Sequence, residues 1–268
     1  MKNIFCGGIL SDIRIEGSRI AGIVPSACDS SGPVPASGVE VVDCRGKPAM
    51  PAFVYMPTHA GMSLMRGIGE DMVLTDWLDH IWEIESSLTD RFVHLGTEVA
   101  ALEMIKTGTT MFNDQYWFST AAQKAASAMG IRNAMSYVFL DHLNPEEAER
   151  EKEQCVRMHA EAEGWESGSK FTIGIHAIYS VSEPLILWAS EYARKHNLRI
   201  HIHVAESEKE DLDCKAVHGG LSPVEYLEEL GVLGPDVIAA HTLWLSEKDI
   251  EILGKHKVNC VHNINSNA

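Results

Sequence analysis

Short apolar segments alternate with helical segments from residue 51 onward, and this alternation restricts the fold more than any other feature of the sequence. Strands are expected to end near Met56, Asp114, Phe139, His176, Val204, His241 and His262. Helices are expected over residues 89–106, 119–129, 145–164, 182–196, 222–230 and 246–256, and Ser182, Ser222 and Ser246 are N-cap candidates for the last three. Alternation at this spacing predicts a parallel sheet with right-handed crossovers.

A parallel sheet of this kind can close into a (β/α) barrel or stay open and doubly wound. The sequence has no Gly-x-Gly-x-x-Gly after its first strand and no P-loop, so the usual marks of a nucleotide-binding open sheet are missing. Polar side chains instead lie at the ends of many strands: His59, Asp114, His176, His203, His241 and His262. Because a barrel gathers all these ends around one mouth, we expect an α/β fold of the (β/α)8 TIM-barrel type. About seven of its eight strands are present, so the barrel is expected to be incomplete.

Residues 1–50 have a different pattern, which predicts short β-strands and turns. Residues 11–23 alternate apolar and polar positions on either side of Gly17 and Ser18, which predicts a β-hairpin. Residues 39–44 predict one further strand. We therefore expect two parts, a small β module over residues 1–50 and the barrel over residues 51–268, ending before strand eight.

The charge of the chain argues against some classes of partner. Its 22 basic and 38 acidic residues give a net charge of −16, which disfavours nucleic acid and anionic membranes. The six cysteines are scattered and form no Cys-x-x-Cys pair, as expected of reduced thiols in a reducing compartment. No segment resembles a signal peptide or a membrane span, so a cytoplasmic protein is expected.

The strand expected over residues 199–204 carries the strongest chemical signal. Its alternation places His201 and His203 on one face, and Glu206 follows three residues after His203. An imidazole at a strand end can hold a divalent cation, and a nearby carboxylate can take the proton of the water that the cation activates. The alternative is a histidine that fills the core beside a surface glutamate. Histidines at other strand ends favour the metal interpretation.

Four stretches together resemble the amidohydrolase superfamily: residues 51–67, 174–180, 201–206 and 239–242. The most similar branch contains the deaminases of S-adenosylhomocysteine and methylthioadenosine and the triazine chlorohydrolases. The resemblance extends from about residue 10 to residue 268. It implies that residues 1–50 are the N-terminal part of a small β-sandwich and that residues 51–268 are a metal-dependent hydrolase barrel.

The resemblance also implies a reaction and a set of site residues. The reaction would be hydrolytic deamination of an aminated purine or related heterocycle by metal-activated water, with one divalent metal, zinc first and iron second. The implied metal ligands are His59, His203 and His241, the implied catalytic residues Glu206 and His241, and the implied substrate contacts Glu85 and His176. Trp77, Leu78 and Trp82 are expected either to form an apolar wall over the ring or to be the buried face of a helix.

Two departures from the family pattern leave a second interpretation open. Pro57 stands where the family has the first histidine of a His-x-His pair, and no counterpart of the family's metal-binding aspartate is present. The alternative is a degenerate, non-catalytic barrel that acts as a binding or assembly subunit. For either interpretation the expected partner is a small molecule, and unpaired barrel edges favour a homo-oligomer or a complementing chain.

Overall fold

The computed structural model describes residues 1–26, 38–69, 71–264 and 266–267. Cys28 lies outside these residues. The chain divides into two compact units, Met1–Ala52 and Phe53–Ala268. None of the described helices is long and apolar enough to cross a membrane.

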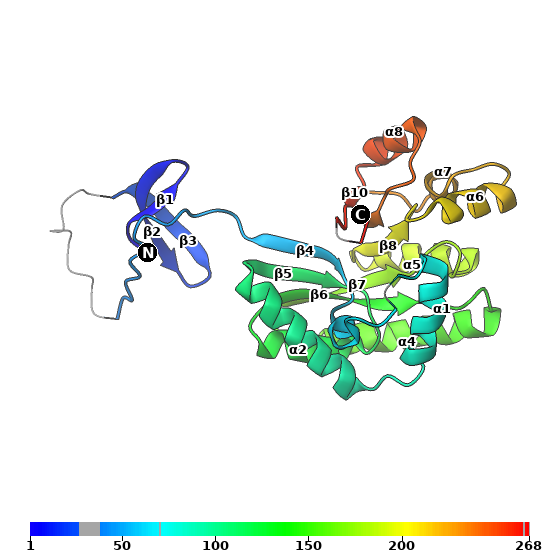
Figure 1. Cartoon of the computed structure of the whole chain (residues 1–268), viewed down its shortest axis with the longest axis horizontal. Helices are drawn as coiled ribbons and strands as arrows, with labels where there is room; N and C mark the ends of the chain where they lie inside the picture. The colour runs from blue at the N-terminus through cyan, green and yellow to red at the C-terminus, as the bar shows by residue number, and fades with distance from the viewer. Residues whose placement is uncertain (27–37, 70, 265, 268) are drawn as a thin grey trace. The chain divides into compact units, whose positions relative to one another are not determined.

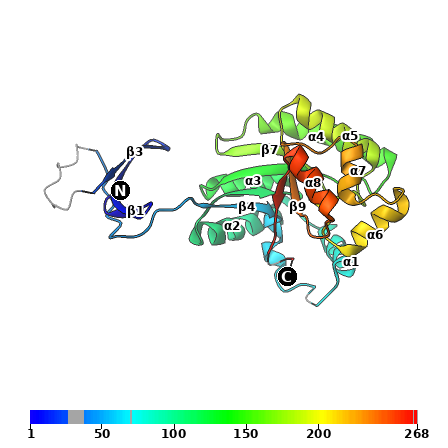
Figure 2. The same ribbon diagram turned by 90° about the horizontal axis from the view of Figure 1, so that it is seen from above.

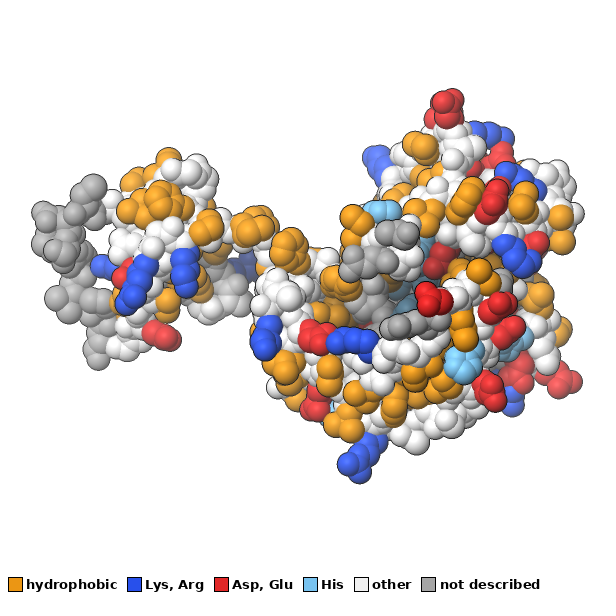
Figure 3. All heavy atoms as spheres, viewed as in Figure 1, with side chains coloured by type: hydrophobic (Ala, Val, Ile, Leu, Met, Phe, Trp, Pro, Cys, Tyr) orange, Lys and Arg blue, Asp and Glu red, His pale blue; other side chains and the backbone are white. Residues whose placement is uncertain are grey.

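The first unit contains a three-stranded antiparallel sheet with the order β1-β2-β3. Its strands are β1 (Ile4–Cys6), β2 (Ile9–Glu16) and β3 (Arg19–Pro25). The hairpin predicted around Gly17 is confirmed by the antiparallel pairing of β2 with β3. The strand predicted over residues 39–44 is wrong, because only an isolated bridge joins Asp43 to Lys2. Figure 3 shows hydrophobic side chains on the surface of this unit. Ile9, Ile20 and Val24 are each more than half exposed. A second sheet would cover them in a β-sandwich, which stays a prediction.

The second unit is built on a seven-stranded parallel sheet in which each strand pairs with its neighbours in the sequence (Figures 1 and 2). The strands are β4 (Phe53–Thr58), β5 (Thr109–Asp114), β6 (Arg132–Phe139), β7 (Ser169–Ile175), β8 (Ile200–Val204), β9 (Val237–His241) and β10 (Asn259–Val261). All seven end within two residues of the predicted positions. This is the strand order of a (β/α) barrel, so the predicted fold class is confirmed, and β4 and β10 are the edges of the described sheet.

Nine helices connect the described strands of this unit. They are η1 (Ala60–Met65), α1 (Leu74–Glu85), α2 (Asp90–Lys106), α3 (Ser119–Ala128), α4 (Pro145–Ala162), α5 (Glu183–Lys195), α6 (Glu208–Val217), α7 (Pro223–Glu229) and α8 (Glu247–His256). The six predicted helices are confirmed as α2–α5, α7 and α8. The sequence predicts no helix at η1, offers a helix as one of two alternatives at α1, and leaves the start of α6 open between a loop and a helix.

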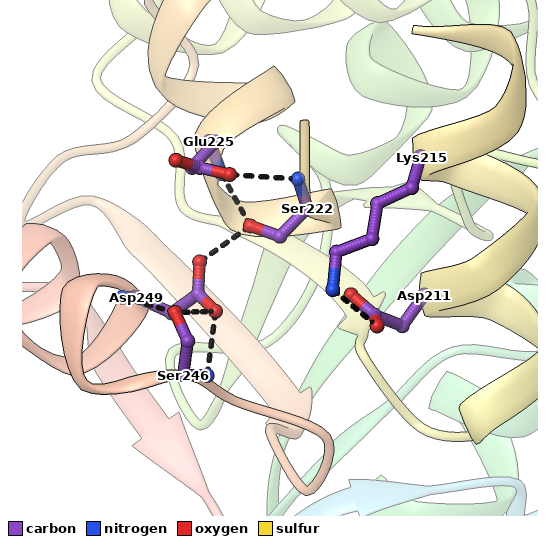
Figure 4. Close-up of polar contacts among 6 residues, drawn as sticks. All are labelled: Asp211, Lys215, Ser222, Glu225, Ser246 and Asp249. Atoms are coloured by element: carbon purple, nitrogen blue, oxygen red, sulfur yellow. Dashed lines mark hydrogen bonds and ion pairs between the residues drawn. The ribbon is translucent and has the colours of Figure 1, made fainter. Parts of the chain in front are cut away.

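Two of the three serines predicted as N-caps form side-chain caps, and the third does not. Ser222 and Ser246 both form capping boxes, with Glu225 and Asp249 three residues later. The side chain of Asp249 also accepts a hydrogen bond from the Ser222 hydroxyl, which ties the start of α7 to the start of α8 (Figure 4). Ser182 is not a cap of this kind. Its hydroxyl and backbone N–H instead donate to buried Asp141, because that carboxylate lies close enough to take both.

The main hydrophobic core lies between the sheet and its helices. Helix α3 contacts β6, α5 contacts β7, and α4 contacts both strands. Residues that are fully buried here include Phe139, Ile173, Ile175, Leu185, Ile200 and Ile202. A second cluster joins η1 to α2, where the helices approach so closely that a Cβ on Gly96 would lie 2.2 Å from the Gly61 carbonyl oxygen. This contact fixes the segment that directly follows His59.

Candidate active site

Four histidines from four different strand ends meet at one place in the barrel. His59 follows β4, His176 follows β7, His203 lies near the end of β8 and His241 ends β9. The ring centre of His203 lies 5.4 Å from that of His59, 5.3 Å from that of His176 and 5.4 Å from that of His241. The carboxyl ends of the strands therefore gather four of the six strand-end side chains that the sequence singled out.

Hydrogen bonds orient two of these rings in the way that metal-binding histidines require. The Nδ1 atom of His59 lies 2.6 Å from the Gln115 carbonyl oxygen, and that of His203 lies 2.8 Å from the His176 carbonyl oxygen. A carbonyl oxygen only accepts, so each Nδ1 carries the proton and each Nε2 keeps a free lone pair. Burial lowers the pKa of both rings, which keeps them neutral. Neutral imidazoles with a free Nε2 are suitable ligands for zinc or iron.

The spacing of the rings also fits a shared cation. Two imidazoles on one tetrahedral zinc, with Zn–N bonds of about 2 Å, have ring centres about 5 Å apart. His59 and His203 match this spacing, as do His203 and His241. Among the described residues, however, no group of three histidine, cysteine or acidic side chains is close enough to hold a metal as it stands. The donor chemistry fits a divalent metal at His59 and His203, while the three-ligand set stays a prediction.

His241 has both ring nitrogens in contact with neighbouring side chains. Its Nδ1 atom lies 2.9 Å from the side-chain amide of Asn267. Its Nε2 atom lies 3.3 Å from the Oε1 atom of Glu206. The same histidine therefore faces the carboxylate that the sequence predicts to be catalytic.

Glu206 is well placed for proton transfer. Its side chain is 18% exposed, and burial raises its pKa to about 7. A carboxyl group with a pKa near neutrality can accept and release a proton within one reaction cycle. Glu206 combines this property with its contact to His241.

A cavity beside the histidines holds both predicted substrate contacts. His59, His176 and Glu85 line it, together with Trp77, Leu78 and Trp82 from α1. The Oε2 atom of Glu85 accepts a hydrogen bond of 2.8 Å from the Trp117 indole, and burial raises the pKa of Glu85. The rings of Trp82 and His176 meet edge to face at 6.2 Å. Trp77, Leu78 and Trp82 thus line this cavity, and their role as an apolar wall over a substrate ring stays a prediction.

Other strand-end side chains have different surroundings. The carboxylate of Asp114 accepts hydrogen bonds from the Thr58 hydroxyl and the Ala60 N–H, both at 2.7 Å. It therefore binds the residues directly before and after His59. His262 is exposed after β10. His201 is fully buried below His203, and its Nδ1 atom contacts the Asn113 amide at 3.1 Å. The Gln115 carbonyl and the side chain of Glu210 were missed by the sequence reasoning, although both contact the site residues or their backbone.

The comparisons with known proteins point to one family. The model of the amidohydrolase family matches residues 49–268. A 5′-deoxyadenosine deaminase of Methanobrevibacter smithii is 39% identical over 230 residues, which cover 85% of this chain and 53% of the relative. A 5-methylthioadenosine/S-adenosylhomocysteine deaminase of Thermococcus onnurineus is 38% identical over 261 residues, 97% of this chain and 60% of the relative. The chain thus spans about half to three fifths of the length of these curated relatives.

Solved structures show the same fold at lower identity. An adenosine deaminase from Xanthomonas campestris with bound zinc has a TM-score of 0.81 and 24% identity, over 94% of this chain and 57% of that one. An atrazine chlorohydrolase from Arthrobacter aurescens complexed with zinc has a TM-score of 0.78 and 17% identity, over 97% of this chain and 65% of that one. A guanine deaminase from C. acetobutylicum with bound guanine has a TM-score of 0.80 and 20% identity, over 94% and 62%.

Proposed function

This chain belongs to the amidohydrolase family, and from that membership we propose that it hydrolyses a carbon–nitrogen bond by deaminating an aminated purine or a related heterocycle. One observation carries the proposal: neutral histidines from separate strand ends surround His203, and Glu206, with its pKa raised to about 7, lies 3.3 Å from one of them, His241. Relatives named as deaminases of 5′-deoxyadenosine and methylthioadenosine support the purine nucleoside class of substrate. None of these names supports the non-catalytic alternative.

His59 and His203 would hold a divalent metal through their Nε2 atoms, with His241 as the third ligand. Zinc is the first choice, because two of the solved structures contain it, and iron is the second. When bound, such a metal supplies the Lewis acidity that lowers the pKa of water toward neutrality. The hydrogen bonds from His59 to Gln115 and from His203 to His176 keep both rings in the tautomer that binds metal.

Glu206 would act as the general base and then as the general acid. It would take the proton of the attacking water and deliver it to the ring nitrogen or to the departing ammonia. His241, 3.3 Å from the Oε1 atom of Glu206, would orient this carboxylate toward the attacked carbon. Both steps need a carboxyl group that changes protonation state near neutral pH, as the raised pKa of Glu206 allows.

Glu85 and His176 would contact the substrate from the cavity wall. Trp82 contacts His176 edge to face and offers an aromatic surface beside a planar heterocycle. The buried carboxyl group of Glu85 would take hydrogen bonds from hydroxyl or amino groups of the substrate.

The free cysteines among the described residues fit a reducing compartment, so we place the protein in the cytoplasm. A homo-oligomer or a complementing chain stays a prediction.

The test follows ammonia release and metal content together. The chain, loaded with zinc, is assayed with 5′-deoxyadenosine, beside the variants Glu206→Gln and His203→Ala. Glu206→Gln should lose about a hundredfold or more of the activity and keep its metal, because general acid–base catalysis contributes about that much. His203→Ala should lose both.

Matched controls come from exposed residues of the same two types. Glu208, exposed two residues after Glu206, supplies Glu208→Gln, and the exposed His196 supplies His196→Ala. Both should keep their activity and metal. Unchanged ammonia release in Glu206→Gln, or unchanged zinc in His203→Ala, would refute the proposal.

A further inference from the structure

We propose that Glu210 is a positioning residue that holds Glu206 in its reactive orientation by binding the backbone N–H groups of Ala205 and Glu206. This inference rests on the proposed function, because it assigns a role toward the catalytic carboxylate. Glu210 touches neither the histidines nor the cavity, so its effect on the reaction would pass through the backbone.

The contacts of Glu210 are unusual for a residue at its position in a helix. The Ala205 N–H donates to its Oε1 atom at 3.0 Å, and the Glu206 N–H donates to its Oε2 atom at 2.8 Å. Only 4% of Glu210 is exposed to solvent. Each carboxylate oxygen therefore takes one backbone donor from the turn that carries Glu206.

The other capping carboxylates of the barrel behave differently. Ser207 is the N-cap of α6, and its hydroxyl accepts from the Glu210 N–H at 3.1 Å. In a capping box the residue at the position of Glu210 bonds the N–H of its own N-cap. Glu225 and Asp249 do this in α7 and α8 (Figure 4). Glu210 instead reaches back past Ser207 to the two residues before it.

The backbone at this turn needs such support. Ala205 has a φ of +51°, a left-handed conformation that costs a residue with a Cβ about 1 kcal/mol or more. Its carbonyl oxygen accepts from the N–H groups of Leu243 and Trp244, both at 3.0 Å. The loop after β9 thus binds the carbonyl oxygen of this turn. Glu210 binds its two N–H groups. Together they fix the direction in which the Glu206 side chain leaves the backbone, toward His241.

Loss of the Glu210 carboxylate should therefore lower kcat and leave substrate binding nearly unchanged. In Glu210→Gln one side-chain oxygen can still accept, but the amide NH₂ group faces the second backbone donor and cannot accept from it. The turn at Ala205 would relax, and Glu206 would move from its 3.3 Å contact with His241. A displacement of about 1 Å in a catalytic group can cost about a hundredfold in rate. We expect kcat to fall about ten- to a hundredfold, with KM and zinc content unchanged.

The control is a buried capping carboxylate that does not contact the catalytic turn. Asp249 is 1% exposed and accepts from the Ser246 N–H and the Ser222 hydroxyl. Asp249→Asn and Glu210→Gln should both lower the midpoint of thermal unfolding. Only Glu210→Gln should lower kcat of the zinc-loaded full chain with 5′-deoxyadenosine. Equal kcat values for the two variants, or a fall in kcat that tracks lost zinc, would overturn the positioning role.

A double variant and amide hydrogen exchange test the role of Glu210 independently. In the Glu206→Gln background, adding Glu210→Gln should cause no further loss of kcat, because the two residues act as one unit. In the unmodified chain, the N–H groups of Ala205 and Glu206 should exchange with solvent as slowly as those of β8. Rapid exchange of either would refute the contact, even if Glu210→Gln fails to fold. If the unmodified chain releases no ammonia, the proposed function fails alone, and the exchange rates still decide the contact of Glu210.

Discussion

A buried carboxyl group on α4 allows a stability prediction whose sign depends on pH. The Oε2 atom of Glu151 is buried and has no hydrogen-bond partner among the described residues. Burial raises the pKa of Glu151 from 4.5 to about 7. Folding therefore favours the protonated form, and this contribution is complete below the unfolded pKa of 4.5 and is lost as the pH rises through 7. Above pH 7 the folded chain must bury a charge.

The size of the effect follows from the two pKa values. At 1.36 kcal/mol per unit, the difference between 4.5 and about 7 corresponds to about 3 kcal/mol, and partial exposure of the side chain lowers the expected cost to about 2 kcal/mol. Glu151→Gln removes the charge and keeps the shape. We expect this variant to exceed the unmodified chain in free energy of unfolding by about 2 kcal/mol at pH 8 and to match it near pH 4.5.

Urea unfolding at both pH values measures this difference. Glu153→Gln, at an exposed position on the same helix, controls for the loss of one negative charge and should change little at either pH. A gain for Glu151→Gln that is the same at both pH values would show that ionisation is not its cause. A loss at pH 8 would show that the carboxylate is paired or solvated, and the reasoning would be refuted.

Two further predictions concern the packing around the site. Gly96→Ala should lower the free energy of unfolding by about 2 kcal/mol or more, because the new Cβ meets the Gly61 carbonyl, whereas Gly254→Ala in α8 meets nothing and should raise it slightly. Thermal unfolding compares the two variants, and equal effects would contradict the close approach of η1 and α2. Asp141→Ala should lower the free energy of unfolding in urea by about 3 kcal/mol, because the N–H groups of Leu143 and Ser182 lose their acceptor. A cost below about 1 kcal/mol would show that water replaces this buried acceptor.

The strand ends were predictable because the physics that places them is local in the sequence. Apolar runs define the strands, and parallel strands bring their carboxyl ends to one side. Histidines at those ends therefore had to meet, and His59, His203 and His241 do so. The sequence also predicted six helices from their apolar periodicity. It left the start of α6 open between a loop and a helix, because charged residues dominate there and few apolar positions mark a face.

The roles of the glutamates after β8 could not be separated in the same way. Glu206, Glu208 and Glu210 alternate within five residues, yet the first faces His241, the second is exposed and the third is buried. The pattern Ser207-x-x-Glu210 is a capping-box signal that could have located the start of α6. It would have paired Glu210 with the N–H of Ser207, however, and missed its contacts with the catalytic turn. The Gln115 carbonyl leaves no sequence signal at all, because every residue has one.

Two buried carboxyl groups, Asp114 and Glu210, explain how this site keeps its geometry. Asp114 binds the groups on either side of His59, and Glu210 binds the backbone that leads into Glu206. Burial raises the pKa of Asp114 to about 6 and that of Glu210 to about 7, so both carboxyl groups carry a cost that their hydrogen bonds partly offset. An apolar residue at either place would leave buried backbone N–H groups without an acceptor. Carboxyl groups persist in such surroundings where an oxygen must accept from a particular donor, and here each such donor adjoins His59 or leads into Glu206. The positions of the reactive groups in this chain thus depend on buried acceptors as much as on the strands themselves.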